Sequence, residues 1–182
     1  PKYIDIVLDQ HDMDRKKYLK KIEFTKQMRD AYFKDINQFA GKNPKKTIIL
    51  RPHPYVELKD YEECYLSVNN LKKLPTNILI KREGSVHEAI SKASTVICWQ
   101  SSVLLDSSIM QKKVYLLEPF DIPDFMKVQF SKNFTKIKSL TEIYDNNLNQ
   151  DDINSYIEYI YGKIDGNSSD RVASLICHLI YN

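Results

Sequence analysis

The chain has 182 residues, a formal net charge of +3, three cysteines and four glycines. This length is enough for one domain with a substantial core, and the sequence contains neither a secretory signal pattern nor an apolar run long enough to span a bilayer. The mild charge comes from scattered lysines without an aromatic–basic platform, which argues against a nucleic-acid-binding protein.

Strand and helix patterns alternate through most of the chain. Short apolar runs predict strands at residues 3–8, 47–50, 77–80, 94–98 and 114–117. Periodicity and turn signals predict helices at residues 15–39, 58–74, from 85 onward, 103–110, 140–147, 153–161 and 171–181. This order predicts an α/β fold in a single domain over residues 1–182: a Rossmann-like doubly wound parallel sheet with helices on both faces, and a C-terminal helical tail that packs back on the sheet.

The strand at 47–50 ends in Arg51-Pro52-His53-Pro54, and this motif is the strongest functional signal in the sequence. The two prolines restrict the backbone on either side of His53, so the imidazole is held at a strand's carboxyl end. Open α/β sheets bind ligands at that edge. We therefore predict that His53 donates a hydrogen bond to a phosphate or protonates it. Arg51 is predicted either to contact the phosphate or to end the strand with a salt bridge.

The strand at 94–98 leads into a second candidate phosphate site. Ser101 and Ser102 open the next helix, where hydroxyls and free N–H groups bind phosphate or simply cap the helix. Gln100 lies beside them and is expected to reach the same ligand. Asp106, one turn beyond Ser102, is predicted to accept hydrogen bonds from ribose hydroxyls, with a solvated helix residue as the alternative.

Other polar residues give weaker signals. Lys81, Arg82 and Glu83 follow the strand at 77–80, and their backbone edge is predicted to read a nucleotide base. Glu88 completes a capping box with Ser85, so we favour capping over a metal site with His87. No metal or other cofactor is predicted. Cys98 and Cys177 lie in apolar runs and are expected to be buried free thiols, as in a reducing cytoplasm.

The motifs in their order resemble the C-terminal, donor-binding half of GT-B glycosyltransferases. They are the strand followed by Arg51-Pro52-His53-Pro54, then the stretch from Gly84 to Ile90, and then Ser101-Ser102 with the following helix through Asp106. The resemblance is to bacterial capsule and lipopolysaccharide enzymes with His-Pro and Ser-Ser motifs, among them sialyl- and polysialyltransferases, capsule Kdo transferases and teichoic-acid glycerophosphotransferases.

The resemblance implies that the chain binds the phosphate of a cytidine-activated donor through His53, Ser101 and Ser102. It implies a CMP- or CDP-linked donor, with a UDP-linked one also open, and a location in the cytoplasm or at the cytoplasmic face of the inner membrane. A GT-B enzyme needs a second domain, so a glycan or glycolipid acceptor would be bound by a further domain or a partner chain. The alternatives are a non-catalytic nucleotide-binding module that serves a partner, and half of a CDP-glycerol-type glycerophosphotransferase.

Overall fold

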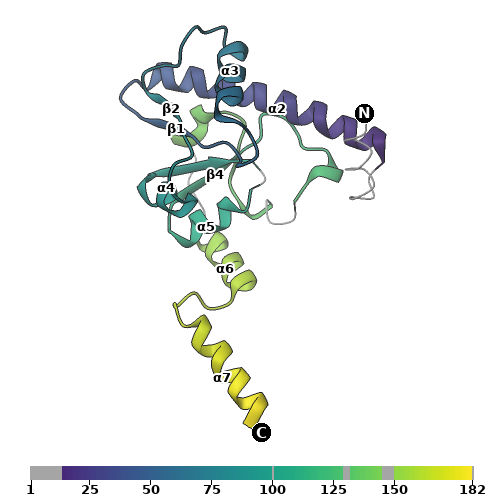
Figure 1. Cartoon of the computed structure of the whole chain (residues 1–182), viewed down its shortest axis with the longest axis vertical. Helices are drawn as coiled ribbons and strands as arrows, with labels where there is room; N and C mark the ends of the chain where they lie inside the picture. Colours follow the sequence, from purple (N-terminus) through teal and green to yellow (C-terminus); the bar gives the residue numbers. More distant parts are fainter. Residues whose placement is uncertain (1–13, 100, 129–131, 145–149, 182) are drawn as a thin grey trace. The chain divides into compact units, whose positions relative to one another are not determined.

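The computed structural model describes residues 14–99, 101–128, 132–144 and 150–181 (Figure 1). The strand predicted at residues 3–8 and the candidate residue Gln100 lie outside these described residues. The chain divides into two compact units. Unit 1 comprises Pro1–Gly84, Leu117–Lys127 and Ile137–Asp145, and unit 2 comprises Ser85–Leu116, Val128–Lys136 and Asn146–Asn182.

Unit 1 contains the long N-terminal helix and a pair of parallel strands. Its elements are α2 (Arg15–Lys42), β1 (Ile48–Leu50), α3 (Leu58–Val68), β2 (Ile78–Ile80) and two 3-10 helices, η1 (Asp124–Met126) and η3 (Leu140–Tyr144). Strands β1 and β2 pair in parallel, with Ile48 opposite Ile78 and Leu50 opposite Ile80. Their carboxyl ends therefore lie at one edge, from which the loops after Leu50 and Ile80 leave together.

The core of unit 1 forms where α2 and α3 pack on this strand pair. Phe33 from α2 meets the ring of Tyr65 edge-on, with centroids 5.1 Å apart. The buried residues of this core are Phe33, Ala40, Leu50, Tyr65 and Ile78. Helix α3 ends at Val68, earlier than the predicted residue 74, and Asn70 beyond it has a φ of 52°. Asparagine tolerates this left-handed conformation better than most residues, so the chain turns there instead of continuing as a helix.

Unit 2 contains the second group of alternating elements. They are α4 (Val86–Lys92), β3 (Thr95–Cys98), α5 (Val103–Ile109), β4 (Lys113–Leu117), α6 (Gln150–Tyr161) and α7 (Ser168–Tyr181). Strands β3 and β4 are parallel, and the sheet has the order β3-β4-β5, where β5 is Lys136–Ile137. The buried core of this unit consists of Leu104, Leu105, Val114, Leu116, Phe134 and Ile157.

The predicted α/β class, with parallel strands and C-terminal helices, is confirmed. The strands form two small sheets, β1-β2 and β3-β4-β5. Within the tail, α6 packs on the core through Ile157, whereas the described side chains of α7 are exposed. The prediction that Cys177 is buried is therefore wrong, because its helix has an apolar face that the described residues do not cover. No helix among the described residues combines the length and the apolar character needed to cross a membrane.

Candidate functional site

The His53 loop, which we define as residues 51–57, leaves the carboxyl end of β1 in a tight turn. The amide of Val56 donates to the carbonyl of His53 at 3.0 Å, which closes the turn. Pro52 is buried and anchors the start of the loop, while the side chain of His53 is exposed. His53 thus lies after the carboxyl end of β1 in a parallel strand pair, the edge at which open α/β sheets bind ligands.

Two arginines fix this loop to the loop that follows β2. Arg82 donates to the carbonyl of Pro54, and its Nη2 donates to the carbonyl of Val56 at 2.6 Å. In the opposite direction, Arg51 donates to the carbonyls of Glu83 at 3.0 Å and Gly84 at 2.6 Å. Each arginine therefore begins on one loop and binds the backbone of the other, and we call this pair of contacts the arginine clasp. Charge-assisted bonds of this kind are stronger than neutral ones, so the clasp holds both loops in one conformation.

The clasp gives Arg51 and Arg82 a role that the sequence did not predict. Their guanidinium groups bind backbone carbonyls, and the Nε of Arg82 is buried without a hydrogen-bond partner. The carbonyls of Glu83 and Gly84 are already paired with Arg51, so a base read by this edge would compete with Arg51 for them. Lys81 extends the strand pairing, since its amide donates to the carbonyl of Leu50 at 3.1 Å.

The ring of His53 is oriented by its own loop. The amide of Tyr55 donates to Nδ1 of His53 at 3.4 Å, and the two rings lie with their centroids 5.0 Å apart. A neutral imidazole that accepts at Nδ1 carries its proton on Nε2. The loop therefore favours the form of His53 that offers an N–H donor to a ligand.

In unit 2, the serine pair lies in the turn between β3 and α5. The hydroxyl of Ser101 accepts from the amide of Val103 at 3.3 Å. Ser102 is the N-terminal cap residue of α5, yet its side chain makes no capping hydrogen bond and is exposed. The two serines thus divide the roles that the sequence left open: Ser101 stabilises the turn, and the Ser102 hydroxyl faces solvent.

Asp106 has a neighbour that the sequence did not predict. Its Oδ2 lies 4.0 Å from Nε2 of His87, and the Asp106 side chain is 33 % exposed, which leaves room for a ligand hydroxyl. His87 and Asp106 come from α4 and α5, two helices that contact each other. The Ser85 hydroxyl accepts from the amide of Glu88 at 3.0 Å, which confirms the predicted cap of α4.

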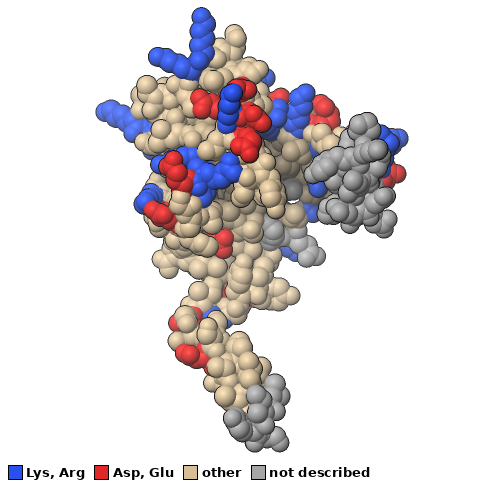
Figure 2. All heavy atoms as spheres, in the orientation of Figure 1, with Lys and Arg blue, Asp and Glu red and all other residues tan. Residues whose placement is uncertain are grey.

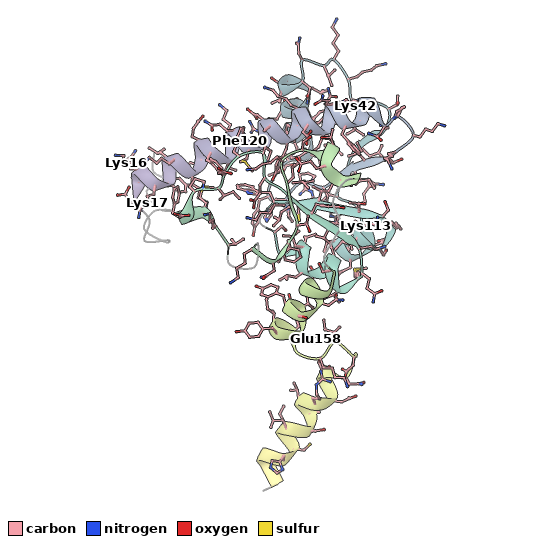
Figure 3. The ribbon with its side chains drawn as sticks, turned by 180° about the vertical axis from the view of Figure 1, so that it is seen from behind. Lys16, Lys17, Lys42, Lys113, Phe120 and Glu158 are labelled. Carbon is pink, nitrogen blue, oxygen red and sulfur yellow. The ribbon has the colours of Figure 1, made fainter. Side chains whose placement is uncertain are left out.

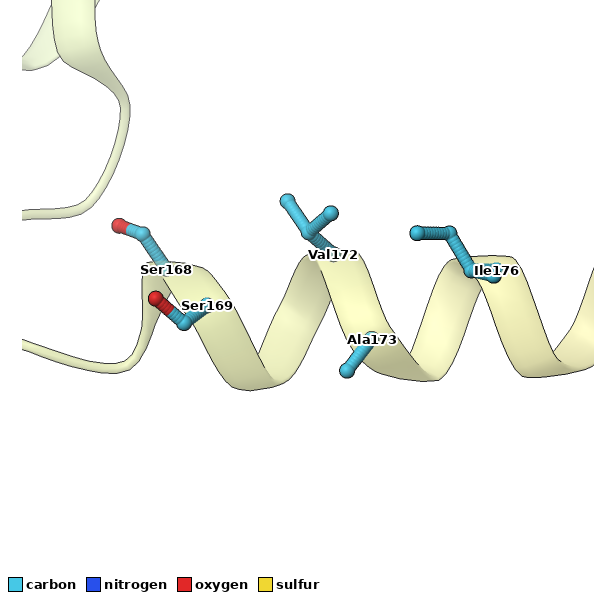
Figure 4. Close-up of a pocket in the computed structure, with 5 residues that line it drawn as sticks. All are labelled: Ser168, Ser169, Val172, Ala173 and Ile176. Atoms are coloured by element: carbon cyan, nitrogen blue, oxygen red, sulfur yellow. The ribbon is translucent and has the colours of Figure 1, made fainter.

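Other features give little indication of chemistry. Burial raises the pKa of the Cys98 thiol to about 12, so the thiol stays protonated and is a poor nucleophile at neutral pH. Among the described residues, no group of three or more His, Cys, Asp or Glu side chains is arranged to hold a metal ion. A hollow lined by Ser168, Ser169, Val172, Ala173 and Ile176 lies along α7 (Figure 4), but one helix supplies its whole lining.

Searches of protein-family models, curated proteins and solved structures find no match to this chain.

Proposed function

We propose that the chain is the donor-binding domain of a glycosyltransferase that builds bacterial surface polysaccharide, with a CMP- or CDP-activated sugar as donor. The observation that carries this proposal is the His53 loop: an exposed imidazole at the carboxyl end of a parallel strand, fixed by the arginine clasp. The order of the motifs in the sequence supports it. Transfer would require an acceptor domain or a partner chain that binds the glycan or glycolipid.

The proposed chemistry uses His53 at the leaving group. During transfer, an acceptor hydroxyl forms a bond to the sugar's anomeric carbon and gives its proton to a base on the acceptor domain or partner chain. The bond between that carbon and the phosphate oxygen breaks, and its electron pair stays on the phosphate oxygen. The Nε2–H of His53 donates to a phosphate oxygen and stabilises the developing charge. From the order of the sequence motifs, we propose that Ser102, whose hydroxyl is exposed, also donates to a donor phosphate and that Asp106 accepts from a ribose hydroxyl.

A non-catalytic nucleotide-binding module and half of a CDP-glycerol-type transferase would use the same groups. In both alternatives, His53 and Ser102 would bind the phosphate as proposed here. Activity separates them: together with its acceptor domain or partner chain, the protein would transfer no group in the first case, and glycerol phosphate in the second.

Nucleotide binding should be selective and should stabilise the fold. We expect CMP or CDP to raise the melting temperature, and NAD and ATP to leave it unchanged, because the chain lacks the glycine-rich loops that hold those cofactors. A ligand at 100 times its Kd stabilises the native state by about 2.7 kcal/mol. For a chain of this size, that raises Tm by roughly 5–10 °C. A thermal-shift titration checks this, and unchanged melting with millimolar CMP, CDP and UDP would contradict the proposal.

We also propose that the protein works in the cytoplasm, at the cytoplasmic face of the membrane. Support comes from the first half of α2, which carries six basic residues and one acidic residue between Arg15 and Gln27. Leu19 and Ile22 on this segment are 48 % and 45 % exposed. Figure 3 labels two of its lysines, Lys16 and Lys17, near the start of the helix. Exposed apolar side chains among basic ones are typical of segments that bind anionic lipid surfaces.

Sedimentation with lipid vesicles tests this location. We expect the protein to bind vesicles that contain anionic lipid, to release them as salt increases, and not to bind neutral vesicles. Replacing the exposed lysines 16, 17, 20 and 21 by glutamate should abolish binding. The matched control makes the same charge change at the exposed lysines 42, 45, 72 and 73. Equal loss of binding in both variants would contradict a specific role for α2. Figure 2 shows Lys and Arg side chains mixed with Asp and Glu on the face in view.

A further inference from the structure

Tyr55 lies in the middle of the His53 loop, and its side chain is 93 % exposed. A single exposed aromatic residue is ordinary on a protein surface and needs no functional explanation. Tyr55 differs because the backbone on both sides of it is held by specific hydrogen bonds.

The arginine clasp and the turn fix the backbone around this ring. Arg82 binds the carbonyls of Pro54 and Val56, the residues directly before and after Tyr55. The amide of Tyr55 itself donates to His53 Nδ1 at 3.4 Å. With its backbone fixed, Tyr55 keeps only its side-chain torsions, so ordering the ring against a ligand costs little conformational entropy.

The position of the ring relates it to the proposed phosphate ligand of His53. The centroids of the Tyr55 and His53 rings are 5.0 Å apart, with 45° between the ring planes. A ring of a ligand whose phosphate is bound at Nε2 of His53 can therefore reach the Tyr55 ring. In a nucleotide-activated sugar, rings lie on both sides of the phosphate, and each presents a face or C–H groups that suit the electron-rich face of an aromatic ring.

We propose that Tyr55 is a binding residue that stacks on a ring of the ligand whose phosphate His53 holds. The inference rests on the proposed function, since it needs a phosphate ligand at His53. The shared chemistry is a ring joined to a phosphate, and its two sources are the nucleotide base and the transferred sugar.

Three probes and three variants test the inference. The probes are inorganic phosphate as a competitor of CMP, CMP itself, and CMP-N-acetylneuraminic acid. Tyr55→Ala should bind a ring-bearing probe about tenfold to a hundredfold more weakly than wild type, the range expected for the loss of one aromatic stack. Its affinity for inorganic phosphate should not change. Tyr55→Phe, which keeps the ring, should bind like wild type, and so should Tyr159→Ala, a control at a tyrosine that is 85 % exposed.

The pattern of losses identifies the ring. Weaker binding of CMP by Tyr55→Ala assigns the stack to the base, and weaker binding of CMP-N-acetylneuraminic acid alone assigns it to the sugar. The inference is wrong, while the proposed function stands, if Tyr55→Ala binds both nucleotides like wild type. It is also wrong if the affinity of Tyr55→Ala for inorganic phosphate falls as much as its affinity for the nucleotides. A wild-type protein that binds neither nucleotide overturns the proposed function itself.

Discussion

Replacing His53 by alanine is expected to lower the turnover of the proposed transferase, assayed with its acceptor domain or partner chain, by about 10²–10³-fold, the range for loss of one donor to a developing charge. The reason is that the Nε2–H of His53 donates to the leaving phosphate oxygen, and the loop favours a proton on Nε2 because the amide of Tyr55 donates to Nδ1. The free energy of unfolding should change by less than about 0.5 kcal/mol, because the ring is exposed. Steady-state kinetics with the activated donor, together with urea unfolding, measures both quantities.

The control for this variant is His178→Ala, because His178 is an exposed histidine on α7 outside the proposed site. It should leave turnover unchanged. A His53→Ala enzyme with wild-type turnover would show that the imidazole is structural, and the proposed leaving-group chemistry would then fail. Loss of both turnover and stability in His53→Ala would indicate that the ring mainly holds its loop.

The two serines are expected to give different results when they are replaced singly. Ser102→Ala should weaken CMP binding by about 1.5–3 kcal/mol, the value of a hydrogen bond to a charged group, with little effect on stability. Ser101→Ala should destabilise the protein by about 1 kcal/mol, because its hydroxyl accepts from the amide of Val103. Calorimetric titration with CMP and thermal unfolding separate the two effects.

Each serine variant serves as the control for the other. If Ser102→Ala unfolds more easily and binds CMP normally, the exposed hydroxyl has a structural role and no ligand. If the two variants behave alike, the division of roles seen at the start of α5 does not hold in solution.

Local sequence signals predicted much of this fold correctly. Ser85 caps its helix as the Ser-x-x-Glu pattern indicated, and the strands at 47–50 and 77–80 appear as β1 and β2. These features are set by residues near in sequence, which is why they can be read without a structure. The turn after α5 was not predicted, because Gln111 adopts a φ of 55° there, a conformation that glycine adopts without strain.

Contacts between distant residues could not be predicted in this way. The sequence offered Arg51 as a phosphate ligand or a salt-bridge partner, whereas the structure pairs it with carbonyls more than thirty positions away. An arginine has five donors and many acceptors in reach, so the choice depends on how the two loops are brought together. The exposure of Tyr55 likewise has no signature in the sequence beyond an aromatic residue after His-Pro.

The central claim is that the His53 loop binds the phosphate of a nucleotide, and residue-resolved NMR during a CMP titration tests it most directly. We expect CMP to shift the signals of residues in the His53 loop, with the same apparent Kd at all of them. Signals on α7 should not move. CMP that leaves the His53 loop unshifted, or that shifts its residues with different affinities, would contradict this claim.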